Sequence, residues 1–408
     1  MNITILTQYF PPEVGAPQNR LYELAIRMQQ KGANVSIVTA MPNYPKMEVQ
    51  EGYENKIYVH EVMDNMHVHR APIYVTKNKG IVFRLLNYFS FVFSSFWIGL
   101  FKTKKTDFIL CESPPLFLGI TAWLLCKTKR AKLIFNVSDL WPESAEKLGL
   151  VSNKFFLKLA TKLEEFLYKT STLILGQTQG IVSNISDRFP TKKVVWIPNG
   201  VDPLLFNKAI NNQGVWRKSM GLSPDDFVLL YAGIMGYAQG LDVITDVASS
   251  LLTNQRIKFI FLGNGPEKER LQHIVSEKNL TNVLFHDFVQ KNEMSAVLKE
   301  IDASIVPLKK LDLFLGAIPS KIFECLASEK PILLGVGGEA KKLFIEDGNA
   351  GLYFEPENVD ALKNVIIQLV QNPKLGSQLG ANGKEYAAKN FNRDIIAEKL
   401  WQEINTLA

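Results

Sequence analysis

The chain has 408 residues with 47% hydrophobic and 21% charged side chains, and its formal net charge is +6. Such a composition excludes wholesale disorder, and the length exceeds what a single hydrophobic core usually serves, so we expect two domains. The modest positive charge suits phosphorylated substrates or an anionic membrane surface. The sequence contains no motif that reads DNA or RNA, and we expect no nucleic acid among the partners.

The cysteines and the first residues indicate the compartment. Cys111, Cys126 and Cys325 stand apart in apolar sequence, without a pairing pattern or metal-ligand spacing, and so favour core positions in a reducing cytoplasm. Residues 3–7 already have the pattern of a strand, which leaves no room for a signal peptide before them. We therefore predict a cytoplasmic protein.

Strand-like runs organise the first half of the chain. They alternate with helical patterns such as residues 19–31, and this alternation predicts an α/β fold with a mostly parallel sheet and helices on both faces. In such sheets ligands bind beyond the carboxyl ends of the strands, so a site is expected in the loops that follow them. The runs lie at residues 3–7, 35–40, 108–111, 132–137 and 173–176.

The first of these loops covers residues 8–20. Gly15 with Ala16 would let an acceptor approach the backbone, and Arg20 in the first turn of the next helix could pair with a phosphate through two hydrogen bonds. A structural turn followed by a surface arginine is the alternative.

A second loop, residues 136–144, places Asp139 and Glu143 directly after a strand. Trp141 and Pro142 would stiffen this loop and offer a sugar ring an apolar face, as is typical of functional loops. The two carboxylates are therefore candidates for contact with substrate. The alternative for Asp139 is the N-cap of the following helix.

The most apolar stretch is residues 85–101, which carry no charge, with Arg84 before them and three lysines soon after. The run is shorter than the roughly 20 residues that span a bilayer, so we expect insertion from one side into the anionic inner leaflet. A basic amphipathic stretch at residues 154–162 would add to that surface. A fully buried core helix is the alternative.

Three histidines raise the question of a metal site. His60, His67 and His69 lie close together in the sequence, with Glu61 and Asp64 between them. His67 and His69 would share one face of a strand, but no third ligand has a suitable spacing. We expect polar residues of an edge strand there, and no metal.

The chain changes character at residues 198–203, a turn with proline at both ends that follows a strand pattern at 193–197. After Phe206, residues 207–214 are polar and without pattern, which marks the best domain boundary. Strand and helix patterns then resume, with strands expected at residues 227–232, 258–262, 283–285, 303–306 and 332–335.

Two glycine loops follow the first two strands of the second half. Gly233, Gly236 and Gly240 lie between a strand and a helix, where backbone amides could face a pyrophosphate. Simple turns are the alternative for both loops. The second loop, which could approach a base or a ribose, contains Gly263, Asn264 and Gly265.

Residues 319–327, followed by a buried strand pattern at 331–335, form the strongest candidate site. Ser320 would cap a short helix with one apolar face, which leaves Lys321 and Glu324 near its first turns. The helix N-terminus attracts phosphate, the lysine would strengthen that attraction, and the carboxylate could accept from ribose hydroxyls. The pattern predicts a nucleotide-diphosphate clamp; a capped, solvated helix is the alternative.

In the order of these motifs the whole chain resembles the retaining family 4 glycosyltransferases of GT-B fold, in which two Rossmann-like, doubly wound domains face a central cleft. The turn 198–202, the two glycine loops, and Glu324 with the apolar helix and Pro331 carry the resemblance. A narrower branch, which builds bacterial O-antigen and capsule units and includes N-acetyl-fucosamine and other aminosugar transferases, is similar at residues 9–13, 139–143 and 319–321.

The resemblance implies how the work is divided along the chain. Residues 1–203 would bind a polyprenyl-diphosphate-linked acceptor at the inner face of the membrane, residues 204–388 would bind a UDP-sugar, and residues 389–408 would form a helix that crosses back to the first domain. The acceptor contacts implied are Glu13, Gly15, Arg20 and Trp141.

The reaction implied is retention at the anomeric carbon by front-face attack, with charge developing on the departing diphosphate. Lys321 would stabilise that charge and Glu324 would bind ribose hydroxyls. Asp139 and Glu143 would orient acceptor or donor hydroxyls. No metal cofactor is required in this scheme.

The chain departs from the family pattern at several positions. Ile234 and Gln239 stand where the family usually has a phosphate-binding arginine and lysine, Gly316 replaces the first of two paired glutamates, and Ser138 replaces a histidine. Stabilisation of the leaving group therefore depends on Lys321, the helix end and backbone amides.

Two other functions are alternatives. A nucleotide-sugar epimerase of the same two-domain shape would need no lipid surface, so residues 85–101 count against it. A non-catalytic partner in a polysaccharide assembly is favoured by Ile234 and Gln239, which remove two cations from the expected phosphate site.

Overall fold

The computed structural model describes residues 1–13, 15–44, 47–78, 80–149, 151–204 and 214–407. The chain forms two compact units, one made of Met1–Asn199 with Arg393–Ala408 and the other of Gly200–Asn392. Except for Gly214, the polar stretch 207–214 that we predicted as the domain boundary lies outside the described residues.

The units divide a few residues away from the expected limits of 203 and 388. The backbone explains the difference, because the N–H of Val201 donates to the carbonyl of Phe391 at 3.0 Å and Val201 forms a β-bridge with Asn392. The turn that begins at Gly200 therefore belongs with the second unit, and so does the chain up to Asn392.

The first unit contains an eight-stranded sheet in the order β3-β4-β2-β1-β5-β6-β7-β8. Among the strands of the described residues, only β3 (Val59–Met63) and β4 (Met66–Ala71) pair antiparallel in this sheet, so the prediction of a mostly parallel sheet is confirmed. A strand that carries His67 and His69 was predicted and is β4, but its antiparallel pairing with β3 was not predicted. The other strands are β1 (Asn2–Leu6), β2 (Asn34–Ala40), β5 (Phe108–Ser113), β6 (Lys132–Val137), β7 (Leu173–Gly176) and β8 (Val194–Trp196).

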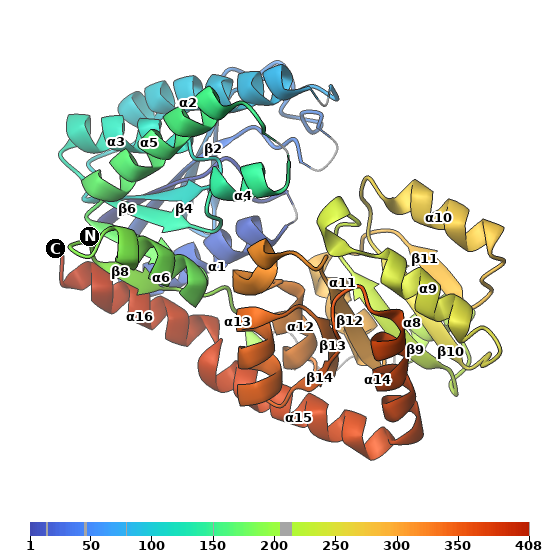
Figure 1. Ribbon diagram of the computed structural model, residues 1–408. Helices are drawn as coiled ribbons and strands as arrows, with labels where there is room; N and C mark the ends of the chain where they lie inside the picture. Colours follow the sequence, from blue (N-terminus) through green and yellow to red (C-terminus); the bar gives the residue numbers. More distant parts are fainter. Residues whose placement is uncertain (14, 45–46, 79, 150, 205–213, 408) are drawn as a thin grey trace. The chain divides into compact units, whose positions relative to one another are not determined.

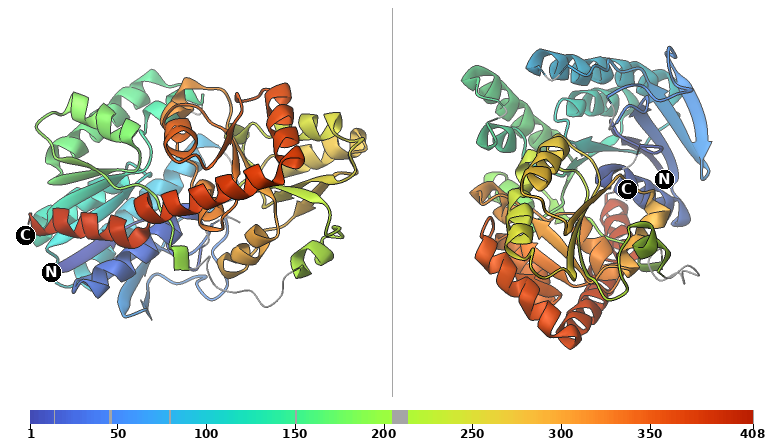
Figure 2. Two further views of the ribbon diagram at one scale, coloured as in Figure 1. Left: turned by 90° about the horizontal axis from the view of Figure 1, so that it is seen from below. Right: turned by 90° about the vertical axis from the view of Figure 1, so that its right-hand side faces the viewer.

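Helices cover both faces of this sheet (Figure 1). Because side chains alternate along a strand, Ile3 and Ile5 face one core and Leu6 faces the other. The core that contains Ile5 is closed by α1 (Ala16–Gln30) and α16 (Arg393–Asn405), which lie side by side (Figure 2). The core that contains Leu6 is closed by α2 (Ile81–Lys102), α3 (Leu118–Lys129) and α5 (Lys154–Thr170).

The second unit contains a six-stranded parallel sheet in the order β11-β10-β9-β12-β13-β14. Helices α9 (Asp242–Ser250), α10 (Lys268–Glu277) and α14 (Val359–Gln371) close one core. The short helix α12 (Lys321–Ala327) packs against α15 (Pro373–Asn390). The strands are β9 (Phe227–Ala232), β10 (Ile257–Leu262), β11 (Val283–His286), β12 (Ala303–Pro307), β13 (Ile332–Gly335) and β14 (Gly351–Tyr353).

Candidate active site

The order of the second sheet brings two loops together. Strand β9 lies between β10 and β12: the chain passes from β9 to β10 on one side and later from β11 to β12 on the other. In such sheets ligands bind beyond the carboxyl ends of the strands at the point where the strand order reverses. Gly233 follows β9 directly, and the loop after β12 leads to Lys321. The two residues meet, because a Cβ added to Gly233 would lie 3.4 Å from Lys321 Nζ.

Lys321 is the residue whose environment is most unusual. Its ammonium lies over the ring of Tyr231, with Nζ 3.8 Å from the ring centroid. In the described part of the chain, no carboxylate lies within 4.0 Å of Nζ. Loss of hydration on burial lowers the pKa of Lys321 to about 7, and the nearby Cys325 thiol acts weakly in the opposite direction. At neutral pH this amine is therefore partly charged and its charge is unpaired.

Helix α12 has the predicted apolar face, since Ile322, Phe323 and Leu326 are buried. The predicted cap is wrong. Ser320 occupies the N-cap position, but its backbone is already helical and its side chain makes no capping hydrogen bond. Glu324 lies one turn after Lys321 and is partly exposed, and its contact with a ribose stays a prediction.

The two glycine loops pack directly on each other. Gly263, with φ of 138°, lies so close to Gly233 that a Cβ on it would come within 2.0 Å of the Gly233 carbonyl oxygen. Gly265, with φ of 155°, packs in the same way on Met235, whose carbonyl oxygen would lie 2.4 Å from a Cβ at position 265. A side chain at 263 or 265 would separate the loops, which is why glycine is required there.

This packing uses backbone amides that we expected to face a pyrophosphate. Gly233 N–H donates to the Leu262 carbonyl at 2.9 Å, and Met235 N–H donates to the Asn264 carbonyl at 2.8 Å. Gly236 N–H donates to the Ile234 carbonyl at 3.0 Å. Contact of these loops, and of Gly240, with a nucleotide stays a prediction, and these three amides would have to exchange partners to make it.

In the first unit, a buried ion pair lies at the carboxyl end of β5. Arg20 Nη2 is 2.6 Å from Glu112 Oε1, and Ser138 and Asn136 also donate to the Glu112 carboxylate. With its amide oxygen turned toward the guanidinium, Gln177 accepts from Arg20 Nε at 2.6 Å. Arg20 is only 6% exposed, so the alternative of a surface arginine is wrong. Phosphate binding by Arg20 stays a prediction that requires exchange of Glu112 for the phosphate.

Glu13 connects two loops of the first unit. Its buried carboxylate accepts hydrogen bonds from the backbone N–H groups of Asn43 and Tyr44, both at 2.8 Å, and of Phe10 at 3.2 Å. Burial raises the pKa of Glu13, and these hydrogen bonds oppose the shift. Gly15 occupies the N-cap position of α1 with an extended backbone. These interactions are all within the protein, so the contacts of Glu13 and Gly15 with an acceptor stay predictions.

Asp139 is held in place by its own loop. Its Oδ2 accepts from Ser144 Oγ at 2.7 Å, and burial raises its pKa while this hydrogen bond opposes the shift. The N-cap position of the following helix α4 (Glu143–Lys147) belongs to Pro142, so the alternative of Asp139 as the N-cap is wrong. Glu143 pairs with Lys147 at 2.6 Å on the surface.

Trp141 joins this loop to an aromatic cluster. Its ring lies edge-on to Phe117 and Phe156, at 5.4 and 6.1 Å between centroids. Phe117 in turn contacts Phe89 of α2 at 4.8 Å. The loop that carries Asp139 is therefore in contact, through aromatic rings, with α2 and α5.

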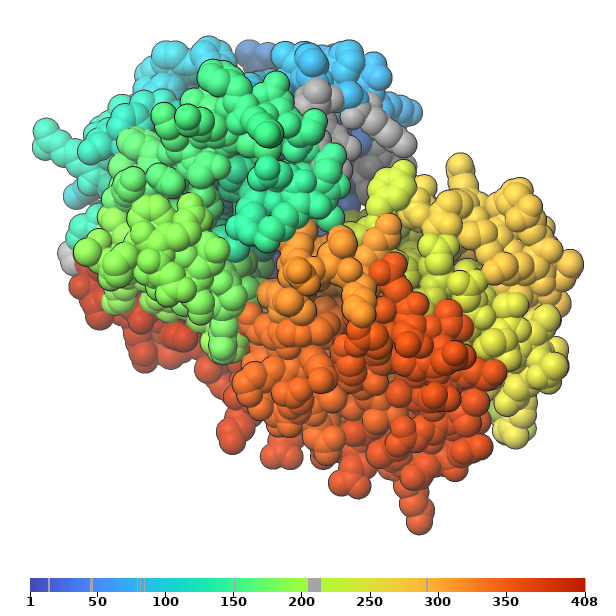
Figure 3. Space-filling model, viewed as in Figure 1, coloured from blue at the N-terminus to red at the C-terminus, as the bar shows by residue number. Residues whose placement is uncertain are grey.

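Among the described residues, one helix is long and apolar enough to cross a membrane by length and composition alone, and it is α2. Only 22% of its Leu85–Lys102 segment is buried, so the alternative of a fully buried core helix is wrong. The helix forms the upper edge of the first unit in Figure 3. Its exposed apolar side chains, which we call the α2 stripe, are Val82, Leu86, Phe89, Phe93, Trp97 and Phe101.

The three histidines lie on β3 and β4. His60 lies on the edge strand β3, as predicted, but His67 and His69 lie on β4, which pairs with β3 and β2, so the edge-strand prediction is wrong for these two. His60 Nε2 is 3.0 Å from His67 Nδ1. His69 is buried on β4 and bonds to the Tyr58 hydroxyl at 2.8 Å. Within the described ranges, no group of three or more histidines, cysteines or carboxylates is placed to hold a metal ion.

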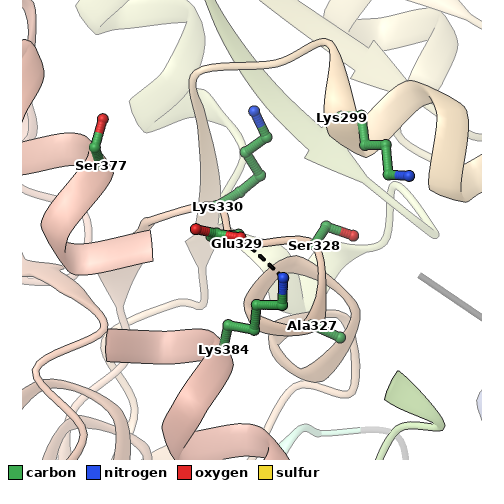
Figure 4. A pocket seen from close by; sticks show the side chains of 7 residues that line it. All are labelled: Lys299, Ala327, Ser328, Glu329, Lys330, Ser377 and Lys384. Atoms are coloured by element: carbon green, nitrogen blue, oxygen red, sulfur yellow. Dashed lines mark hydrogen bonds and ion pairs between the residues drawn. The ribbon is translucent and has the colours of Figure 1, made fainter. Parts of the chain in front are cut away.

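A pocket of about 360 Å³ lies at the C-terminal end of α12 (Figure 4). Lys384 and Glu329 form an ion pair of 2.9 Å across it. None of the predicted site residues lines this pocket, and we assign it no part in the site. Its lining residues are Lys299, Ala327, Ser328, Glu329, Lys330, Ser377 and Lys384.

Sequence comparison agrees with this architecture. Residues 18–204 match the family model described as Glycosyltransferase Family 4, and residues 212–386 match the model described as Glycosyl transferases group 1. Together the two matches span most of the chain. The protein is therefore an enzyme of the group 1 and family 4 glycosyltransferases, and its two Rossmann-like units with parallel sheets are those of the GT-B fold.

Individual proteins resemble the chain over its whole length. "Putative colanic acid biosynthesis glycosyl transferase WcaI" of Escherichia coli (strain K12) is 26% identical, over 99% of this chain and 100% of its own. The sucrose-phosphate synthase structure from Thermosynechococcus elongatus has a TM-score of 0.78 at 16% identity, covering 100% of this chain and 98% of its own. Anabaena Alr3699/HepE in complex with UDP-glucose has a TM-score of 0.74 at 15% identity, covering 100% of both chains.

Proposed function

We propose that this glycosyltransferase is a retaining enzyme that moves a sugar from a UDP-sugar to a lipid-diphosphate-linked saccharide in bacterial surface polysaccharide synthesis. The expected sugar is an N-acetylated aminosugar such as N-acetyl-fucosamine. The full-length similarity to a protein named for colanic acid biosynthesis supports the pathway class. The UDP-glucose complex of a protein with the same fold supports the donor class.

The observation that carries the proposal is the unpaired ammonium of Lys321 beside Gly233. Cleavage of the donor leaves negative charge on the nucleotide diphosphate, and a cation fixed at that point lowers the barrier most. Lys321 would bind the departing diphosphate, while Glu324 would accept hydrogen bonds from the ribose. Asp139 and Glu143 would orient hydroxyl groups for front-face attack, and the scheme assigns no step to a metal.

The acceptor side of the proposal is supported by the α2 stripe. Exposed aromatic side chains on one face of a helix, followed by exposed Lys102, Lys104 and Lys105, are typical of a segment that lies in the interface of an anionic membrane. On α5, exposed Phe155 and Leu159 lie among exposed lysines and would extend the same surface. We infer a peripheral protein at the inner face of the membrane, where a polyprenyl-diphosphate-linked saccharide is available.

A transfer assay tests this function. The purified full chain is incubated with a panel of UDP-sugars and vesicles that contain a polyprenyl-diphosphate-linked monosaccharide. Release of UDP with a lipid-linked product one sugar longer, whose new linkage keeps the donor's anomeric configuration by NMR, is the expected result. Epimerised donor without a longer lipid product, or no turnover of any donor, would contradict the proposal and favour an epimerase or an assembly partner respectively.

A further inference from the structure

The Lys321 ammonium lies on the ring of Tyr231, a residue to which the reaction scheme gives no role. Tyr231 is the fifth residue of β9 and is only 1% exposed. Its hydroxyl donates to the Ile234 carbonyl at 2.6 Å, and its ring contacts Phe261 at 5.9 Å between centroids. The orientation of the ring is therefore fixed by contacts that do not involve Lys321.

A ring face supports a charge in a different way from a carboxylate. The negative face of an aromatic ring attracts an ammonium, but it carries no net charge and leaves the ammonium's own charge available to another partner. Elsewhere in the chain the buried cation Arg20 is paired with Glu112, and an incoming anion would have to displace that carboxylate. At Lys321 no described carboxylate within 4.0 Å needs to be displaced.

We propose that Tyr231 is a positioning residue of the donor site, which holds the ammonium of Lys321 against Gly233 by its ring face and so keeps that charge unpaired until a nucleotide diphosphate binds. This inference rests on the proposed function, because it assumes that the diphosphate binds at Lys321. On this inference the affinity for the diphosphate depends on Tyr231 as well as on Lys321.

The arrangement couples diphosphate binding to a proton. The pKa of Lys321 is lowered to about 7 by burial, and an anion beside it would raise that pKa again. Among the described residues, the titratable groups beside the amine are Tyr231 from β9 and Cys325 from α12. Burial raises the pKa of both, so both are neutral near pH 7. The protein should therefore take up part of a proton when it binds a diphosphate near neutral pH.

Calorimetry with UDP on the full chain measures this coupling. With a pKa of about 7, the charged fraction of Lys321 falls from about one half at pH 7 to about one hundredth at pH 9, so UDP binding should weaken by about 50-fold over that range. The terminal phosphate of UDP titrates at about pH 6 and adds little above pH 7. The heat of binding should differ between buffers of different ionisation enthalpy, in the direction of proton uptake.

The role of the ring is tested at position 231. Tyr231→Phe keeps the ring face, and trifluorophenylalanine at the same position keeps its shape but withdraws electrons from it. Relative to the phenylalanine variant, the fluorinated protein should bind UDP about 2- to 30-fold more weakly at pH 8 and recover as the pH is lowered. Tyr231→Leu should shift the pH profile in the same direction, and thermal melting shows whether that variant folds.

The outcomes separate the two proposals. Loss of the pH dependence in Lys321→Met, together with a shifted profile in the fluorinated protein, supports both. Wild-type pH dependence that is abolished by Lys321→Met, with identical profiles for the phenylalanine and fluorinated proteins, overturns the role of Tyr231 and leaves the donor site intact. If Lys321→Met binds UDP like the wild type at every pH, the diphosphate does not bind at Lys321, and the donor site falls together with the inference.

Discussion

The guanidinium of Arg20 and the carboxylate of Glu112 form an ion pair of 2.6 Å in which neither side chain is more than 8% exposed. Glu112 lies near the end of β5 and Arg20 in the first turns of α1, so the pair ties a strand end to the helix that follows β1. Removal of one charge from a buried pair leaves the other charge unpaired in a medium of low polarity, and this unpaired charge strongly destabilises the folded state.

We therefore expect Glu112→Gln to lower the free energy of unfolding by about 3 to 5 kcal/mol. Chemical denaturation followed by circular dichroism measures the loss. The matched control is the double variant Arg20→Met with Glu112→Met, which removes both charges and should recover much of the stability. A single variant as stable as the wild type would show that the pair is not the buried interaction we describe.

The sequence could indicate where this site lies but not how its side chains pair. The strand patterns placed the loops of Arg20 and Asp139 at the carboxyl ends of parallel strands, where the structure also has them, and contact of these loops with a ligand stays a prediction. Glu112 was missed, although a carboxylate at the end of an otherwise apolar strand was a signal. Pairing depends on which strands are neighbours, and the order β2-β1-β5-β6, which brings Glu112 next to Arg20, is not readable from local pattern.

The same limit applies to Tyr231 and to the first sheet's edge. An aromatic residue in an apolar strand looks like core, and Tyr231 is core except for the one face that Lys321 covers. At the edge of the first sheet a polar strand around His67 and His69 was predicted, but its antiparallel pairing with β3 was not. Asp64 and Asn65 join the two strands, and both have positive φ, as type I′ hairpin turns require.

Substitution of Lys321 tests the donor side of the reaction. Lys321→Met should reduce the rate of transfer by about 10²- to 10³-fold, the usual effect of losing one group that stabilises transition-state charge. Lys330→Met is the matched control, because Lys330 is also a partly buried lysine but lies beyond the opposite end of α12. The rate of sugar transfer from UDP-sugar to the lipid acceptor is the measurement. Equal losses in both variants would mean that α12 is merely sensitive to substitution.

Asp139→Asn should separate activity from stability. Burial raises the pKa of Asp139, so its stabilising contribution is present below its usual pKa of 3.8 and is lost as the pH rises through the raised value. At neutral pH the ionised carboxylate therefore weakens the fold, and the variant should unfold at a higher denaturant concentration than the wild type. Transfer should fall by about a hundredfold or more if the carboxylate orients a hydroxyl. A variant that is less stable and equally active would contradict both statements.

The α2 stripe predicts membrane binding. Phe93, Trp97 and Phe101 are 68%, 43% and 70% exposed, and their replacement by serine should reduce the partition coefficient onto anionic vesicles by about a hundredfold or more. Sedimentation with vesicles containing phosphatidylglycerol measures this.

The control for membrane binding is a triple serine variant at Ile57, Val62 and Ile395, which are as exposed but lie outside α2. This control should sediment with the vesicles like the wild type. Raised salt should weaken binding of both, because the lysines after α2 contribute by charge. Unchanged sedimentation of the α2 variant would remove the stripe from the mechanism.

His69 predicts how the first unit responds to acid. The pKa of His69 is lowered from 6.5 to about 4. The main cause is burial, and the positive charges of the nearby His60, His67 and Lys102 contribute less. As the pH falls, His69 is protonated in the unfolded chain at a higher pH than in the folded protein. The stability that neutral His69 contributes is therefore fully present above pH 6.5 and is lost as the pH falls from 6.5 to 4. A shift of this size corresponds to about 3 kcal/mol.

We expect His69→Gln, which can still bond to the Tyr58 hydroxyl, to lose about 3 kcal/mol less than the wild type between pH 6.5 and pH 4. Urea denaturation at a series of pH values measures the difference, and subtraction of the two curves cancels the carboxylates that titrate in the same range. His60→Gln serves as the control, because His60 lies on the exposed edge strand and its removal leaves His69 buried. Parallel stability curves for the wild type and His69→Gln would show that His69 titrates in the folded protein as it does in the unfolded chain, and that burial at β4 does not keep it neutral.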